Sequence, residues 1–277
     1  MHIQKEKYIN PLTDFGFKKL FGTEPNKILL IDFLNQILPD KKIADLSYAS
    51  GEKQGLTELD RKAIFDLYCI SDKGERFIVE MQKAKQNYFK DRSVYYASFP
   101  IQEQAEKGDW NFKLEPVYTI GILDFIFYEG KEEIEPLQMV ELKNQKNEVF
   151  YDKLKYIYIE LPKFKKTAED LFFRFEKWLY VFKHLSRLTD RPQKLQEKVF
   201  EQLFRNAEIS KFTPNERVSY QKSLKYYRDL KNVTDTARDE GKVEGKIEVA
   251  KNLKTMGLSM EQIVQATGLS KGEIEVL

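Results

Sequence analysis

The chain has little of the side-chain chemistry that thiols and imidazoles provide. Its 277 residues include one cysteine, Cys69, and two histidines, His2 and His184. A single cysteine excludes a disulfide framework and is typical of a reducing cytosol, so we expect a cytoplasmic protein. Neither histidine has the partners that a catalytic triad or a zinc site requires, which argues against both kinds of chemistry.

Long apolar runs, a strong net charge and a glycine-rich phosphate loop are also missing. No run of about 18 apolar residues occurs and the first residues are polar, so we expect no membrane span and no signal peptide. The 46 basic and 44 acidic residues leave a net charge of only +2. This balance neither requires nor excludes a nucleic-acid partner, and any basic surface must be local.

The order of the hydrophobic patterns predicts an α/β protein. The expected elements are helices at 13–22 and 25–38, strands at 62–70 and 76–82, a helix at 88–107 kinked at Pro100, strands at 116–127, 137–143 and 154–161, and a helix at 167–188. The strand at 116–127 is the most apolar and is expected to be central. The helix at 167–188 is amphipathic, and its broad apolar face is expected to pack in the core with Phe172, Phe175, Trp178, Leu179 and Phe182. We therefore predict a mixed central sheet flanked by helices, followed by a helical C-terminal extension.

The C-terminal part carries its own helix-start signals. Thr213, Ser259 and Ser270 each open a capping box, with glutamate or glutamine three residues later. The last two frame a helix-turn-helix-like segment that turns at Gly268. Its second helix is short and sets Lys271 against two glutamates, so a hairpin for self-association or for a partner is at least as good an interpretation as a DNA reader. We expect three domains, at 1–190, 191–255 and 256–277.

The first hairpin carries polar residues in an otherwise apolar strand. In ERFIVEMQ, Glu80 and Gln82 are two residues apart and therefore share one face. If residues 72–74 form a three-residue loop, Asp66 lies opposite Glu80, with Cβ atoms roughly 5 Å apart. A two-residue loop at 73–74 would shift the register by one and move Asp66 to the other face.

Two opposed carboxylates repel each other unless a positive group lies between them. A hard divalent cation such as Mg²⁺, with Mn²⁺ as an alternative, suits oxygen ligands from Asp66 and Glu80. Gln82 could then orient a water molecule or a phosphate oxygen, an arrangement suited to phosphodiester hydrolysis. The competing interpretation is that Glu80 is a solvated charge that protects a sheet edge.

Four basic residues near the hairpin are candidates for contacts with a nucleic-acid backbone. Arg61 precedes the first strand, Lys83 and Lys85 follow the second, and Arg92 opens the next helix. Arginine can hold two phosphate oxygens at once, and lysine adds affinity without sequence selectivity. Each of the four could also simply face the solvent.

With these residues in view, the chain resembles the PD-(D/E)XK nuclease superfamily, in the branch where glutamine replaces the motif lysine. More closely, it resembles the recombination-promoting nuclease and putative transposase family of bacterial proteins. The resemblance covers nearly the whole chain. The stretches that carry it are DFGFKKLFG, DRKAIFDLYCISDKGERFIVEMQ, DRSVYYAS, PVYTIGILDF, IELPKF and the C-terminal EGKVEGKIEVAKNLKTMGLSMEQIVQATGLSKGEIEVL.

The resemblance implies a restriction-endonuclease-like core and Mg²⁺-dependent cleavage of DNA, in connection with recombination or mobile elements. It carries the cleavage site over to Asp66, Glu80 and Gln82. Asp14 corresponds to an acid that is often near the metal, although it could instead complement the dipole of its own helix. Because Gln82 cannot supply the charge of a lysine, the alternative is a weak or inactive nuclease-fold module that binds DNA or protein. Double-strand cleavage with one active site per chain would favour a homodimer.

Overall fold

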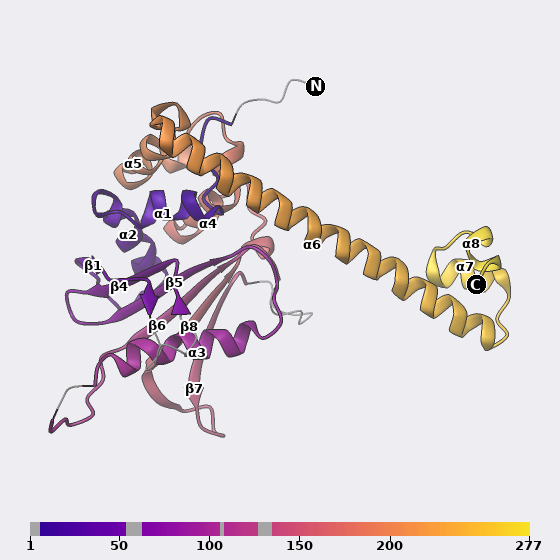
Figure 1. The fold of residues 1–277 in the computed structure, drawn as a ribbon, viewed down its shortest axis with the longest axis horizontal. Helices are drawn as coiled ribbons and strands as arrows, with labels where there is room; N and C mark the ends of the chain where they lie inside the picture. Colours follow the sequence, from indigo (N-terminus) through magenta and orange to yellow (C-terminus); the bar gives the residue numbers. More distant parts are fainter. Residues whose placement is uncertain (1–5, 54–62, 106–107, 127–134) are drawn as a thin grey trace. The chain divides into compact units, whose positions relative to one another are not determined.

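The computed structural model describes residues 6–53, 63–105, 108–126 and 135–277. The chain forms two compact units, residues 1–227 and 228–277, which are described separately. The first unit contains a mixed sheet with helices on both faces (Figure 1). None of the described helices combines the length and the apolar character needed to cross a lipid bilayer.

The sheet of the first unit has six strands in the order β1-β4-β5-β6-β8-β7. The strands are β1 (Leu46–Tyr48), β4 (Leu67–Ser71), β5 (Arg76–Gln82), β6 (Val117–Leu123), β7 (Leu137–Lys143) and β8 (Val149–Glu160), and a separate pair is formed by β2 (Glu52–Lys53) and β3 (Ala63–Ile64). The neighbouring strands β5, β6 and β8 run parallel, whereas the pairs β1-β4, β4-β5 and β7-β8 are antiparallel. All seven residues of β6 are buried, as expected for the central strand.

Helices from distant parts of the chain cover this sheet. The α-helices of the first unit are α1 (Asp14–Phe21), α2 (Lys27–Ile37), α3 (Phe89–Gln102), α4 (Arg174–His184), α5 (Lys198–Ala207) and the first part of α6 (Pro214–Thr255). Short 3₁₀ turns join them: η1 (Glu24–Asn26), η2 (Leu161–Lys163), η3 (Leu185–Arg187), η4 (Gln193–Leu195) and η5 (Ile209–Lys211). The predicted α/β fold, a mixed sheet flanked by helices with a helical C-terminal stretch, is confirmed.

The two faces of the sheet bury different clusters. Phe77 and Val79 face the large core built with α1, α2, α4 and α5, where the Trp178 and Phe200 rings lie 5.0 Å apart. The opposite face of the sheet is covered by α3 (Figure 1), and there Ile78 packs in a smaller cluster with Phe99. Strand alternation therefore points Glu80 and Gln82 toward the α3 face, together with Ile78.

Several elements differ from their expected bounds. The helix expected at 88–107 ends at Gln102, and the strand expected at 154–161 begins at Val149. The strand expected at 62–70 is broken at Asp66, so that β3 and β4 pair with different partners. The helix expected from residue 167 begins only at Arg174, because the Glu176 carboxylate accepts the N–H groups of Phe172 and Phe173 and caps the helix there. Phe172, expected on the buried face, is consequently 80% exposed.

The segment before α1 and the first turn of α1 are hydrogen-bonded to elements that come nearly 200 residues later or more. The Ile9 N–H donates to the carbonyl oxygen of Ala207 at 2.9 Å. The Asn10 N–H donates to the Tyr220 hydroxyl at 2.9 Å, and the Phe15 N–H donates to the Ser223 hydroxyl at 3.1 Å. The first turns of α6 are thus part of the same core as the sheet.

The second unit consists of the end of α6 with α7 (Met260–Thr267) and α8 (Lys271–Glu275). The capping boxes at Ser259 and Ser270 are confirmed, and Gly268 takes the left-handed conformation (φ +70°) that turns the chain between the two helices. Its core comprises Ala250, Ile263, Leu269 and Ile274. Residues 191–227 belong to the same compact unit as the sheet, and the three-domain division expected from the sequence stays a prediction.

Candidate active site

The hairpin register predicted for a three-residue loop is confirmed. Gly74 has φ +81°, and the Ser71 N–H donates to the Glu75 carbonyl oxygen at 2.8 Å. The ladder then pairs Ile70 with Arg76 and continues to Leu67 opposite Val79. The next residue on each strand is Asp66 and Glu80, so the loop sets the two carboxylates opposite each other.

Asp66 and Glu80 are held in place by hydrogen bonds across the strand pair. The Asp66 backbone N–H donates to Glu80 Oε1 at 3.1 Å, and the Met81 N–H donates to Asp66 Oδ2 at 2.8 Å. The break between β3 and β4 frees the Asp66 N–H from the ladder and lets it make this bond. The backbone thus fixes both acids before any ligand binds.

The electrostatics of the pair favour a cation. Burial raises the pKa of Asp66, and the charge of Asp14 adds to the effect. Burial, followed by the charge of Asp66, raises the pKa of Glu80 to about 8. Two acids that resist ionisation together form a site where a positive ion is stabilised, and their oxygen atoms suit a hard divalent cation.

No group of three or more acidic, histidine or cysteine side chains is gathered as a metal cluster within the described residues. Asp14, the third expected ligand, lies on α1 and forms an ion pair with Lys18 at 2.8 Å. A Mg²⁺ ion commonly keeps several waters and uses only one or two carboxylates, so Asp66 and Glu80 fit that donor set. A role for Asp14 as a ligand stays a prediction.

The Gln82 amide is engaged on both sides. Its Oε1 atom accepts a hydrogen bond from Nη2 of Arg92, on α3, and its Nε2 atom donates to the Ala84 carbonyl oxygen at 3.2 Å. Arg92 Nη1 also donates to Gln86 Oε1 at 2.6 Å. The structure therefore brings Arg92, expected from the sequence only as a phosphate contact, directly to the strand end that carries Glu80 and Gln82.

A small cavity of about 10 Å³ lies on the inner side of Glu80. Arg92 and Thr119 also line it, and the Thr119 hydroxyl is buried without a hydrogen-bond partner among the described residues. Gly121 stands opposite Glu80 on β6, where an added Cβ would come within 3.0 Å of the Tyr158 ring. The room is enough for about one water molecule between these groups.

An open cleft of about 820 Å³ lies near the carboxylates on the α1 side. It is lined by Asp14, Phe15, Lys18, Lys19, Gly22, Thr23, Lys83, Ser219, Lys222, Ser223 and Tyr226. Burial disfavours the charged form of Lys18. The hydrogen bond to Asp14 and the charges of Asp66 and Glu80 outweigh this effect, so the pKa of Lys18 is raised. Four lysines thus line a cleft that adjoins the acidic pair, and we name it the lysine cleft.

Lys83 lines the lysine cleft and also interacts with the charge of Asp66. Burial lowers the pKa of its ammonium, while the charges of Asp14 and Asp66 act in the opposite direction. Its Nζ atom lies 5.1 Å from the centre of the Tyr226 ring on α6. The sequence indicated Lys83 but missed Lys18, Lys222 and Tyr226, because only the tertiary fold brings α1 and α6 together.

The remaining predicted backbone contacts are placed differently. Lys85 is exposed and does not line the lysine cleft, and Arg61 lies outside the described residues. Both stay predictions.

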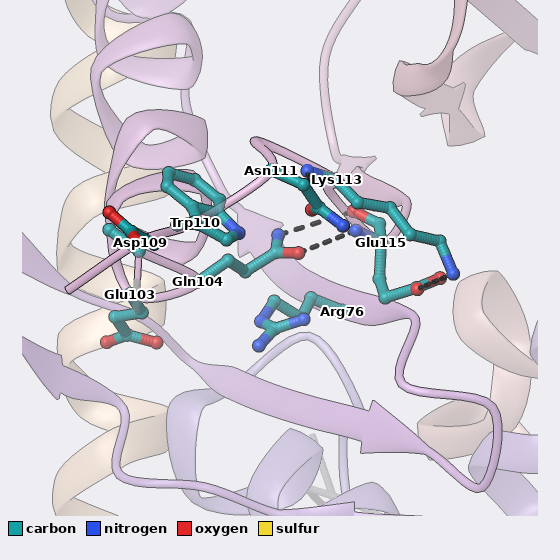
Figure 2. A pocket seen from close by; sticks show the side chains of 9 residues that line it. Arg76, Glu103, Gln104, Asp109, Trp110, Asn111, Lys113 and Glu115 are labelled. Carbon is teal, nitrogen blue, oxygen red and sulfur yellow. Dashed lines mark hydrogen bonds and ion pairs between the residues drawn. The ribbon is translucent and has the colours of Figure 1, made fainter. Parts of the chain in front are cut away.

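A second hollow of about 620 Å³ lies at the other end of β5, around Arg76 (Figure 2). Gln104 fixes its wall by accepting the Glu115 N–H at 2.6 Å and donating to the Glu115 carbonyl oxygen at 3.3 Å. Its lining includes Glu103 and Trp110 but none of the predicted site residues. Because Arg76 begins β5 and Gln82 ends it, this hollow is separate from the acidic pair.

The comparison with known proteins agrees with this geometry. A family model described as PD-(D/E)XK nuclease family transposase matches residues 11–237. No curated protein and no solved structure matches the chain. The matched region contains the acidic pair, Gln82, Arg92 and the part of α6 that lines the lysine cleft. The resemblance predicted from the sequence is thereby confirmed, and the chain belongs to the PD-(D/E)XK nuclease family transposases.

Proposed function

We propose that this protein is a Mg²⁺-dependent endonuclease that hydrolyses phosphodiester bonds of DNA in the cytoplasm, in connection with recombination or mobile elements. The observation that carries the proposal is the pair Asp66 and Glu80, fixed opposite each other with raised pKa values beside the lysine cleft. Membership of a nuclease family of transposases supports DNA as the substrate.

In the proposed mechanism, Asp66 and Glu80 hold the divalent cation, with Mg²⁺ as the expected metal, Mn²⁺ as an alternative and Asp14 as a further candidate ligand. Such an ion, when bound, lowers the pKa of a water molecule and polarises a phosphoryl oxygen. The lysine cleft, with Lys83 at its inner end, binds the DNA backbone by charge, and such contacts give affinity without sequence information. Gln82 positions the attacking water through its amide.

A second function is a nuclease-fold module that binds DNA or protein without cleaving it. This function is favoured by the hydrogen bonds of the Gln82 amide, which already contacts Arg92 and Ala84 instead of pointing freely toward a substrate. A chain of this kind would still bind a nucleic-acid backbone in the lysine cleft. It would not require metal at Asp66 and Glu80.

Cleavage of supercoiled plasmid in Mg²⁺ or Mn²⁺ separates the two functions. The variants are Asp66→Asn and Glu80→Gln, because each keeps an oxygen that accepts the backbone N–H and removes only the charge. Asp239→Asn, on the exposed part of α6, is the matched control. The nuclease predicts metal-dependent nicking that both site variants abolish and the control retains.

The other outcomes have distinct meanings. Folded wild-type protein that leaves the plasmid intact with every metal contradicts the nuclease and supports the binding module. Cleavage that survives both site variants places the activity elsewhere or in a contaminant. Nicks that convert to double-strand breaks with a second-order dependence on protein concentration would support the homodimer, which is a further part of the proposal.

A further inference from the structure

The strand end that carries the acidic pair supplies two acids and a neutral amide but no positive side chain of its own. Hydrolysis of a phosphodiester places additional negative charge on the phosphoryl oxygens, and an enzyme gains most from cationic donors aimed at that charge. Arg92, on α3, can supply such a cation. Arg92 Nη2 donates to Gln82 Oε1, and Arg92 lines the same small cavity as Glu80.

The geometry around Arg92 fixes its guanidinium in place. Its Cζ atom lies 5.5 Å from the centre of the Phe89 ring and 5.8 Å from the centre of the Tyr96 ring. These residues lie three positions before and four positions after Arg92, so one side of α3 forms an aromatic support. Gln86 accepts a further hydrogen bond from Nη1. A guanidinium has five N–H donors, so it can hold both glutamines and still donate to a phosphate oxygen.

The lysines near the acidic pair interact with other groups. Lys18 forms an ion pair with Asp14. The Lys83 ammonium lies over the Tyr226 ring in the lysine cleft, and strand alternation points position 83 away from the face of Glu80 and Gln82. Arg92 differs from both because it reaches the site from the α3 face and carries a planar guanidinium that can hold two phosphate oxygens at once.

We propose that Arg92 is a catalytic residue, a cation delivered from α3 that contacts the scissile phosphate and stabilises the charge that develops during cleavage. The inference rests on the proposed nuclease function and changes the role expected for Arg92, from affinity for DNA to stabilisation of the transition state. Besides its proposed contact with the attacking water, Gln82 then positions the guanidinium through its Oε1 atom.

The test removes the positive charge at position 92 and then introduces a positive charge at position 82. Arg92→Gln removes the charge and Arg92→Lys keeps it, while Lys90→Gln removes a positive charge from an exposed position of the same helix as the matched control. The double variant Gln82→Lys with Arg92→Gln puts an ammonium where the amide now meets the guanidinium. Gln82→Lys alone and Lys83→Gln complete the set, and urea denaturation verifies that each variant is folded.

Three measurements distinguish catalysis from binding: the single-turnover cleavage rate, the Kd for duplex DNA without metal, and the Kd for Mn²⁺ by calorimetry. We expect Arg92→Gln to lower the cleavage rate about 100-fold, the effect of removing one donor to a developing oxyanion. Both Kd values should change less than about fivefold, because neither measures the transition state. Arg92→Lys should retain more activity, and Gln82→Lys should restore at least tenfold to Arg92→Gln.

Several results would overturn the inference while leaving the nuclease intact. One is an active Arg92→Gln variant. Another is a loss of DNA affinity as large as the loss of rate, which would make Arg92 a binding residue. A third is rescue by Gln82→Lys of Lys83→Gln but not of Arg92→Gln, which would assign the cationic role to Lys83. Wild-type protein without cleavage activity would refute the proposed function and this inference with it.

Discussion

Glu80 should destabilise the metal-free protein at alkaline pH, and Glu80→Gln should remove that penalty. Burial and the charge of Asp66 raise the pKa of Glu80 from an ordinary 4.5 to about 8. The folded chain therefore binds more protons than the unfolded chain between these two pH values, and stability falls as the pH rises through this window. Glutamine stays neutral and keeps an oxygen to accept the Asp66 N–H.

The size of the effect follows from the width of that window. At roughly 1.4 kcal/mol for each pKa unit, the interval sets an upper limit of about 5 kcal/mol. Asp66 shares the repulsion and solvent reaches part of Glu80, so we expect a gain on the order of 2 to 4 kcal/mol for Glu80→Gln above pH 8. Below pH 4.5 the gain should vanish, because Glu80 is then protonated in both states.

Urea unfolding at pH 5 and at pH 8.5, in the presence of a chelator, measures this difference. Addition of Mg²⁺ at pH 8.5 should stabilise the wild-type protein and leave Glu80→Gln nearly unchanged, because the variant lacks a charged ligand. Glu141→Gln serves as a control, since its hydrogen bond to Lys155 lowers the pKa of Glu141 and its replacement should bring no gain. Equal stability of wild type and Glu80→Gln at both pH values would refute the reasoning.

Three further predictions concern the supports of the fold. Gly74→Ala should cost about 1 kcal/mol in urea unfolding, because φ at this position is +81° and alanine is strained there. Asp32→Ala should cost about 2 to 3 kcal/mol and lower the thermal midpoint, because it leaves the buried Trp178 Nε1–H without its acceptor at 2.8 Å; Asp32→Asn should cost less, and an equal cost would contradict this account. Ser259→Ala and Ser270→Ala should each remove about 1 kcal/mol of cap energy. Amide hydrogen exchange should then accelerate in α7 and α8 but not in the sheet.

The acidic pair could be predicted from the sequence because its geometry is local. One turn, with its left-handed Gly74, sets the register of β4 and β5 and therefore the positions of Asp66 and Glu80. The proposal that the two share a metal needed no distant part of the chain. The same strand alternation places Gln82 on the face of Glu80, and the family resemblance agrees with that choice of residues.

The rest of the site could not be read in this way because it depends on long-range contacts. Lys222 and Tyr226 come to the lysine cleft from α6, more than 130 residues beyond Lys83 along the chain. Arg92 was visible as a cation after the hairpin, but its bond to Gln82 depends on how α3 lies on the sheet. Hydrophobic spacing places Phe172 on a helix face because it cannot reveal that the Glu176 carboxylate caps the helix after that residue.

The hydrogen bonds that join the first residues to α5 and α6 have a consequence for how the protein is made. The hydrogen-bond partners of Ile9, Asn10 and Phe15 are Ala207, Tyr220 and Ser223. The amino-terminal segment can therefore form these bonds only late in synthesis. The lysine cleft is lined by residues of α1 and by residues of α6 up to Tyr226. It can therefore form only after the chain has emerged from the ribosome beyond residue 226. Incomplete translation products therefore carry Asp66 and Glu80 without the wall of the lysine cleft that α6 supplies.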